Sequence, residues 1–264
     1  MFEVMARLQI RAGKVDGFKQ QAAEVMRLAR ELDTKTLRYD WFIDADETEC
    51  EVREVYLDAD GLFEHNNHVV TERDKLFRDH AFGHDMTMYG EPSPALAELM
   101  ERMAGHVAFH RYLLWQSLDG DDQTRRATHA REKGAGMFEA TAHLEIREGQ
   151  LEGFKQQAAE VMRQMREQDE QPLRYDWFLS DDGSECEVRE AYVDADALLE
   201  HQQQVAEAKT NLFREFVAGH TMTFYGEPSP ALVGALKAMG TTYTTFSFLQ
   251  GLGADIDIRE EVPA

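Results

Sequence analysis

The sequence repeats itself once, and this repeat limits the possible folds more than any other feature. With an offset of 136 positions, residues 2–96 align with residues 138–232 without a gap, and 57 of the 95 aligned positions are identical. The shared runs include GFKQQAAEVMR, LRYDWF, ECEVRE and YGEPSPAL. A period of this length is too long for a solenoid and is typical of one domain. We therefore assign two copies of one domain to residues 1–118 and 137–264, with an aperiodic, charged linker at 119–136.

The periodicity within each copy predicts an alternation of strands and helices. Strict apolar–polar alternation is typical of a half-buried strand, whereas apolar residues three or four apart are typical of an amphipathic helix. An acidic turn between two β-rich runs predicts a hairpin, and Asp or Ser-Pro before an apolar run predicts the start of a helix. The expected elements are strand 2–10, helix 15–32, strands 37–43 and 49–57, a helix capped by Asp58–Asp60, strand 84–90, a helix begun by Ser93-Pro94, and strand 106–115, matched by strand 242–251.

The order βαββαβ predicts a ferredoxin-like unit, with both helices on one face of an antiparallel sheet. The other face, which carries Glu3, Met5, Arg7 and Gln9 of the first strand, has no helix to cover it. Such a face commonly packs on a second sheet at a spacing of about 10 Å. We therefore expect an α+β fold in which two tandem ferredoxin-like repeats pack sheet-to-sheet as an intramolecular dimeric α/β barrel. The chain would be its own pseudo-dimer, with higher assembly left open.

Composition argues against several classes of partner. The net charge of −22 would repel the phosphates of nucleic acids and anionic membrane surfaces. No apolar stretch approaches the length of about 18 residues that a membrane span needs, and the N-terminal segment does not resemble a signal peptide. Cys50 and Cys186 occupy equivalent strand positions in the two copies, where a disulfide between them is not expected. A reducing compartment, the cytoplasm, fits this cysteine usage best.

Three groups of residues resemble a known family. Arg38, Tyr39 and Asp40 lie on one predicted strand, Glu54 and Tyr56 on the next, and Leu62 and His65 on the helix that follows. This pattern resembles the antibiotic biosynthesis monooxygenase superfamily of dimeric α/β-barrel proteins, with Tyr56 in place of the usual Trp. The second copy repeats the pattern at Arg174, Tyr175, Asp176, Glu190, Tyr192, Leu198 and His201.

The resemblance implies a monooxygenase that needs no cofactor, neither flavin nor metal. Oxygenases of this family bind an electron-rich aromatic, such as an anthrone or a quinol, between sheet and helices. Removal of a proton gives a carbanion that reduces O₂ directly. The expected partners are thus O₂ and a small aromatic or hydrophobic substrate. Two alternatives stay open: a non-catalytic barrel that binds a small hydrophobic ligand or serves a stress response, and a structural duplication whose cavities are filled by side chains.

The residues predicted to be catalytic are two histidines and two glutamates. His65 and His201 lie on the sheet-facing side of the second helix, where a neutral imidazole can exchange a proton near neutral pH. The alternative is a packed histidine that serves the core. Glu54 and Glu190 interrupt an apolar alternation, so each is either placed for proton transfer or paired with an arginine such as Arg38, and pairing is favoured.

The residues predicted to bind substrate are aromatic side chains and strand-end histidines. The tyrosines and tryptophans would stack on a flat substrate, or else form the core. The histidines would line the mouth of the cavity, or else lie exposed at the ends of strands. These residues are Tyr39, Trp41, Tyr56 and His84 in the first copy and Tyr175, Trp177, Tyr192 and His220 in the second.

Metal binding is not expected. His65 and His68 lie one helical turn apart, and His80 and His84 follow. The second copy has Gln204 and Phe216 where the first has His68 and His80, and no spacing typical of a zinc site occurs. These differences also predict that the two cavities differ in polarity, so that one copy is active and the other structural. Which copy is active is left open.

Overall fold

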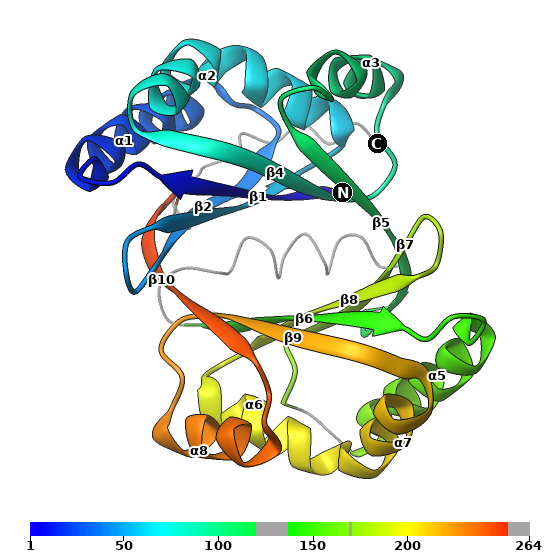
Figure 1. Cartoon of the computed structure of the whole chain (residues 1–264). Coiled ribbons are helices and arrows are strands. Elements are labelled where there is room, and N and C mark those ends of the chain that lie inside the picture. Colours follow the sequence, from blue (N-terminus) through cyan, green and yellow to red (C-terminus); the bar gives the residue numbers. More distant parts are fainter. Residues whose placement is uncertain (120–136, 169–170, 253–264) are drawn as a thin grey trace. The chain divides into compact units, whose positions relative to one another are not determined.

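The computed structural model describes residues 1–119, 137–168 and 171–252 (Figure 1). These residues form two compact units. The first contains residues 1–109 and 249–252, and the second contains residues 110–119, 137–168 and 171–248. Apart from Asp119, the predicted linker at 119–136 lies outside the described residues.

The first unit is a four-stranded antiparallel sheet with helices on one face (Figure 1). Its strands lie in the order β4-β1-β3-β2, with Phe2 opposite Tyr56 and Val4 opposite Met88. This is the strand order of a ferredoxin-like fold. The elements are β1 (Phe2–Ile10), α1 (Val15–Leu32), β2 (Thr36–Asp44), β3 (Glu49–Tyr56), α2 (Ala59–Asp79), β4 (Ala81–Tyr89) and α3 (Pro94–Met103).

The second unit repeats this plan with two additional strands. Its central sheet has the antiparallel order β9-β6-β8-β7; β5 adds antiparallel to β7, and β10 adds parallel to β9. The elements are β5 (Ala108–Ser117), β6 (Phe138–Ile146), α5 (Leu151–Gln168), β7 (Arg174–Ser180), β8 (Glu185–Tyr192), α6 (Ala195–Gln204), α7 (Ala206–Phe216), β9 (Val217–Tyr225), α8 (Pro230–Met239) and β10 (Tyr243–Gly251).

The strands that end each repeat belong partly to the other compact unit. Most of β5 follows the first repeat in sequence but lies in the second unit, where Leu113 is opposite Leu179. The end of β10 lies in the first unit, where the Leu252 amide donates a hydrogen bond to the Tyr39 carbonyl at 3.2 Å. Repeats and compact units are therefore different divisions of the chain. The repeat boundaries at 1–118 and 137–264 stay a prediction.

Local sequence signals place the main elements as expected. The first strand and first helix occupy the predicted residues, and the α+β class with two ferredoxin-like repeats is confirmed. Asp58 begins α2 by accepting a hydrogen bond from the Gly61 amide at 2.9 Å, and Ser93 begins α3 by accepting one from the Leu96 amide at 3.3 Å. Each cap satisfies an amide at the start of a helix, where no helical carbonyl is available.

Each sheet has an apolar face toward its helices and a charged opposite face. In the first unit, Val4, Leu8 and Val52 pack with Phe18 and Val25 of α1 in one buried cluster. On the opposite face, arginines pair with buried carboxylates of the same sheet. These ion pairs are Arg38–Asp40 at 2.6 Å, Arg7–Glu51 at 2.7 Å and Arg174–Asp176 at 2.7 Å.

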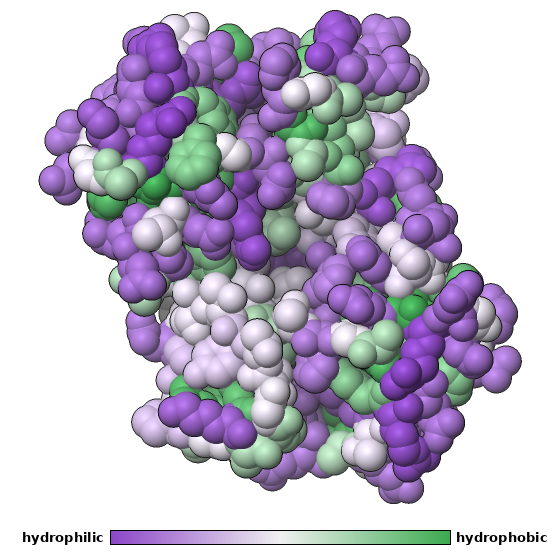
Figure 2. All heavy atoms as spheres, in the orientation of Figure 1, coloured by the Kyte–Doolittle hydropathy of each residue, from purple (hydrophilic) through white to green (hydrophobic). Residues whose placement is uncertain are grey.

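The visible outer surface of both units is largely hydrophilic, as a net charge of −22 requires (Figure 2). Green apolar patches are small and interrupted by polar residues. Within the described part of the chain, every helix is too short or too polar to cross a membrane.

The second helix differs between the repeats. In the first repeat α2 runs without a break, whereas in the second the helix is interrupted at Val205, between α6 and α7. Val205 has φ −98° and ψ 10°, outside the α-helical region. The sequence did not predict this interruption, because both copies have valine at this position and the same helical spacing of apolar residues.

Two helix glycines allow a test of this packing. A Cβ at Gly153 of α5 would lie 2.4 Å from the Phe216 ring, whereas a Cβ at Gly234 of α8 would meet no atom within 4 Å. We expect Gly153→Ala to lower the free energy of unfolding by about 1–3 kcal/mol through overpacking. Gly234→Ala should raise it by about 0.5–1 kcal/mol, because alanine favours the helix. Urea unfolding of both variants measures this, and changes of the same sign would contradict the packing.

Candidate functional site

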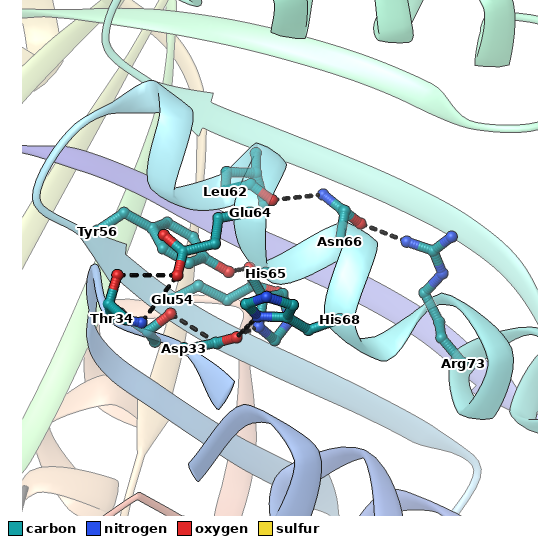
Figure 3. Close-up of polar contacts among 11 residues, drawn as sticks. Asp33, Thr34, Glu54, Tyr56, Leu62, Glu64, His65, Asn66, His68 and Arg73 are labelled. Atoms are coloured by element: carbon teal, nitrogen blue, oxygen red, sulfur yellow. Dashed lines mark hydrogen bonds and ion pairs between the residues drawn. The ribbon is translucent and has the colours of Figure 1, made fainter. Parts of the chain in front are cut away.

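A buried carboxylate holds two histidines in the first repeat. Asp33 directly follows α1. Its Oδ2 atom lies 2.6 Å from Nδ1 of His65, and its Oδ1 atom lies 2.8 Å from Nδ1 of His68 (Figure 3). The Thr36 hydroxyl donates a further hydrogen bond to Oδ2 at 2.8 Å. Asp33 therefore fixes the orientation of the His65 ring, which lies buried between α2 and the sheet.

The environment of Asp33 favours its ionised form. Burial alone would raise the pKa of the carboxyl. The hydrogen bond and the charge of His65, together with hydrogen bonds from His68 and Thr36, hold this pKa below its usual range. Sequence reasoning missed Asp33. The available signal was its repetition as Asp169, although Asp169 lies outside the described residues.

The two predicted catalytic glutamates each bind a tyrosine. The Tyr56 hydroxyl donates to Glu54, and the Tyr192 hydroxyl donates to Glu190 at 2.6 Å. All four side chains are buried, and burial raises the pKa of Glu54. The favoured pairing of Glu54 with Arg38 is wrong, because Arg38 lies on the other side of the sheet and pairs with Asp40.

The predicted aromatic residues surround the buried histidines. The Tyr39 ring lies 4.6 Å from that of His65, and the Tyr175 ring lies 4.9 Å from that of His201. Trp41 and Trp177 are each 2% exposed and contact these tyrosines edge-on. In the first repeat this cluster leaves little free space beside His65.

The cavity beside His65 is small. It has a volume of about 40 Å³ and is lined by Tyr39, Trp41, Glu54, His65 and His84, among others. A neighbouring cavity of about 20 Å³ lies toward α3, and Arg73 lines both. These volumes suit one or two water molecules rather than an aromatic substrate.

The second repeat has a much larger cavity. It has a volume of about 350 Å³ and lies between α6 and α7, α8 and β9. This volume falls within the range of about 300–1,000 Å³ typical of small-molecule sites. Its walls are mostly apolar; the lining residues include Leu198, Gln202, Lys209, Phe213, His220, Met222, Phe224, Leu232, Ala235 and Leu236.

One aligned substitution contributes to the difference in volume. With the 136-residue offset, Leu99 of the first repeat corresponds to Ala235. Leu99 lines the small cavity toward α3, whereas Ala235 lines the larger cavity. The smaller side chain on α8 leaves more room for a ligand.

The large cavity contains one histidine. His220 lies at the edge of the Phe213 ring, with 4.8 Å between ring centroids. Burial and the nearby Lys209 cation lower the pKa of His220 below its ordinary value. His220 is therefore neutral near pH 7 and able to accept a proton from a ligand. Its equivalent, His84, lies in the small cavity, where burial and Arg73 lower its pKa to about 4.

The predicted site residues thus fall into different places. In the first repeat, Tyr39, Trp41, Glu54, His65 and His84 line one small cavity. In the second repeat, the large cavity includes His220 and excludes the other predicted residues, which are His201, Glu190, Tyr175, Trp177 and Tyr192. Their roles stay predictions. Sequence reasoning missed Lys209 and Ala235, although aligning the two copies position by position exposes both differences.

Comparison with known proteins relates part of the sequence to one family and most of the chain to the fold of two solved structures. Residues 137–218 match the family model described as antibiotic biosynthesis monooxygenase. No curated protein matches the chain. A candidate monooxygenase from Fusobacterium nucleatum has a similar structure, with 11% identity and a TM-score of 0.58 over 84% of this chain and 89% of that one. A candidate monooxygenase from Lactobacillus acidophilus has 10% identity and a TM-score of 0.54 over 84% of this chain and 90% of that one. MupZ from Pseudomonas fluorescens is 27% identical over 42% of this chain and 87% of its own, with a TM-score of 0.35.

Proposed function

Because the chain contains a domain of the antibiotic biosynthesis monooxygenase family at residues 137–218, we propose that it is a cofactor-independent monooxygenase that oxidises a quinol or polycyclic aromatic with O₂. The reaction takes place in the large cavity of the second repeat. The observation that supports this most directly is a cavity of about 350 Å³ with apolar walls and a neutral histidine. The cavity beside His65 is too small for such a substrate.

His220 is the general base in this proposal. An anthrone carries an acidic CH₂ group between two aromatic rings, and the neutral imidazole accepts one of its protons. The resulting carbanion transfers one electron to O₂, and the two radicals combine into a peroxide. After reprotonation, loss of water from the hydroperoxide leaves a carbonyl. One oxygen atom of O₂ thus enters the product and the other leaves as water, so the substrate itself supplies all the electrons.

The apolar walls have two roles in this chemistry. Phe213 and Phe224 line the cavity and supply apolar surface for the rings of a substrate. The mostly apolar walls offer few polar groups to a localised anion, which favours spreading of the negative charge over the rings of the substrate. Proton removal by His65, as predicted from the sequence, requires a larger space beside that ring than the first cavity provides.

Filling the cavity tests the proposal. Ala235→Leu introduces into α8 the side chain that the first repeat has at position 99. We expect this variant to lower kcat/KM for oxygen uptake by roughly tenfold or more, because the substrate loses contacts and space. The measurement is oxygen uptake by metal-free protein over a panel of anthrones and naphthohydroquinones.

Leu99→Ala, the reciprocal change in the first repeat, is the matched control and should leave the rate unchanged. Absence of uptake across the panel would contradict the proposal, as would equal losses in both variants. Thermal stabilisation by the same compounds without oxygen uptake would instead identify a ligand-binding protein.

A further inference from the structure

The large cavity contains a cation for which the described part of the chain supplies no carboxylate partner. Lys209 of α7 is half-buried and lines the cavity. Its ammonium group donates to Gln202 and lies 5.8 Å from the centre of the Phe213 ring. Among the described residues, no carboxylate oxygen lies within the ion-pair distance of 4.0 Å from its Nζ atom. Burial lowers the pKa of Lys209, whereas the charge of Glu190 raises it by a smaller amount. Glu190 itself accepts a hydrogen bond from Tyr192.

The equivalent cation of the first repeat has an acidic neighbour. Arg73 has Asp74 at 3.6 Å and also donates to Asn66 (Figure 3 shows the contact with Asn66). Thr210 replaces Asp74 in the second repeat, whereas a basic residue is retained at position 209. The second repeat therefore keeps the positive charge, loses the neighbouring acid and opens a cavity at the same place.

A positive charge facing an apolar cavity is costly unless an anion accompanies it. An ammonium group has three donors, and Gln202 accepts from one of them. The remaining donors are available to a ligand. Because charge-assisted hydrogen bonds are stronger than neutral ones, an anionic oxygen is the ligand group that this geometry favours.

We propose that Lys209 binds an acidic group of the ligand, so that the cavity selects aromatic acids or ionised phenols over neutral aromatics. The aromatic part rests on the function proposed above, whereas the acidic group rests on Lys209 alone. Lys209 is then a specificity-determining residue, and the apolar walls hold the rings.

Binding of matched naphthalenes tests the proposal without turnover. The probes are 2-naphthoate, its neutral analogue 2-naphthamide, and 2-naphthol titrated across its ionisation, each measured by calorimetry. The wild type should bind 2-naphthoate about tenfold or more tightly than 2-naphthamide. Lys209→Met should remove this preference and Lys209→Arg should retain most of it. If 2-naphthol binds more tightly once it is ionised, the preference extends to phenolates. If ionisation does not raise the affinity, the preference is restricted to carboxylates.

The control is Lys237→Met, which removes an exposed lysine from α8 of the same unit and should keep the preference. Equal affinities of the wild type for 2-naphthoate and 2-naphthamide would overturn the inference, as would a preference that survives in Lys209→Met. Oxygen uptake separates the two proposals. If oxygen uptake falls in Ala235→Leu but the wild type does not prefer 2-naphthoate, the proposed function stands and the role of Lys209 is wrong. If the wild type prefers 2-naphthoate but takes up no oxygen, the acid-binding site stands and the proposed function is wrong.

Discussion

Replacing His220 by glutamine is expected to lower kcat for oxygen uptake by about 10²–10⁴-fold, the usual contribution of a general base. Glutamine keeps a polar side chain at the cavity wall but cannot accept the substrate proton. Oxygen consumption by metal-free protein at saturating anthrone measures the effect. His84→Gln, the same change in the first repeat, is the matched control and should retain the wild-type rate.

The pH dependence gives a second measure of the same base. Since burial and Lys209 lower the pKa of His220, the neutral form persists below the ordinary histidine pKa of about 6.5. The rate of the wild type should therefore begin to fall only at pH values below 6.5. An equal loss in His220→Gln and His84→Gln, or an acid limb that His220→Gln does not alter, would exclude His220 as the base.

Replacing Asp33 by asparagine is expected to lower the free energy of unfolding by about 2–4 kcal/mol at pH 7. The carboxylate is buried and binds His65, His68 and Thr36, so its loss leaves these groups with a weaker, neutral partner. Urea unfolding measures the change. The control is Asp85→Asn, at an exposed position of β4, which should change the free energy little.

The effect of Asp33 should depend on pH in one direction. Its pKa in the folded protein lies below the unfolded value of about 3.9, so its stabilising contribution is complete above that value. The contribution is lost as the pH falls through the folded pKa. The difference between wild type and Asp33→Asn should thus be constant above about pH 4 and shrink as the pH falls below the unfolded pKa of about 3.9. A difference that grows on acidification, or one no larger than that of Asp85→Asn, would contradict this account.

Local sequence patterns were sufficient for most of the fold. The alternation of Phe2–Ile10 and the helical spacing of Val15–Leu32 reflect contacts between near neighbours, and the caps at Asp58 and Ser93 involve amides only three residues away. Strand partners are a different matter. No local signal indicates that β5 pairs with β7, because strand pairing depends on the path of the whole chain.

The candidate site was less predictable for the same reason. His65 is held by Asp33 from a different element, 32 positions earlier, and sequence spacing gives no sign of that contact. The second cavity is lined by Ala235 where the first repeat has Leu99, and sequence alone does not show that this position faces a cavity. His220 lines the large cavity, and its role there stays a prediction. Lys209, which together with burial lowers the pKa of His220, was not recognised. A lysine on a helix ordinarily indicates only a solvated surface.

The two repeats have thus kept one fold and diverged at the cavity. In the first repeat, Leu99 and Arg73 line a small cavity toward α3. In the second, Ala235 and Lys209 line a much larger cavity beside the interrupted helix. The first repeat therefore provides matched controls for the substitutions at Ala235 and His220.

A crystal structure with a bound hydroxyanthraquinone, an analogue of the expected product, is the most direct measurement. We predict ligand density between α6, α7, α8 and β9, with a ligand oxygen within hydrogen-bond distance of His220 or Lys209. Density beside His65 in the first repeat would contradict the account, as would an empty second cavity at saturating ligand concentration.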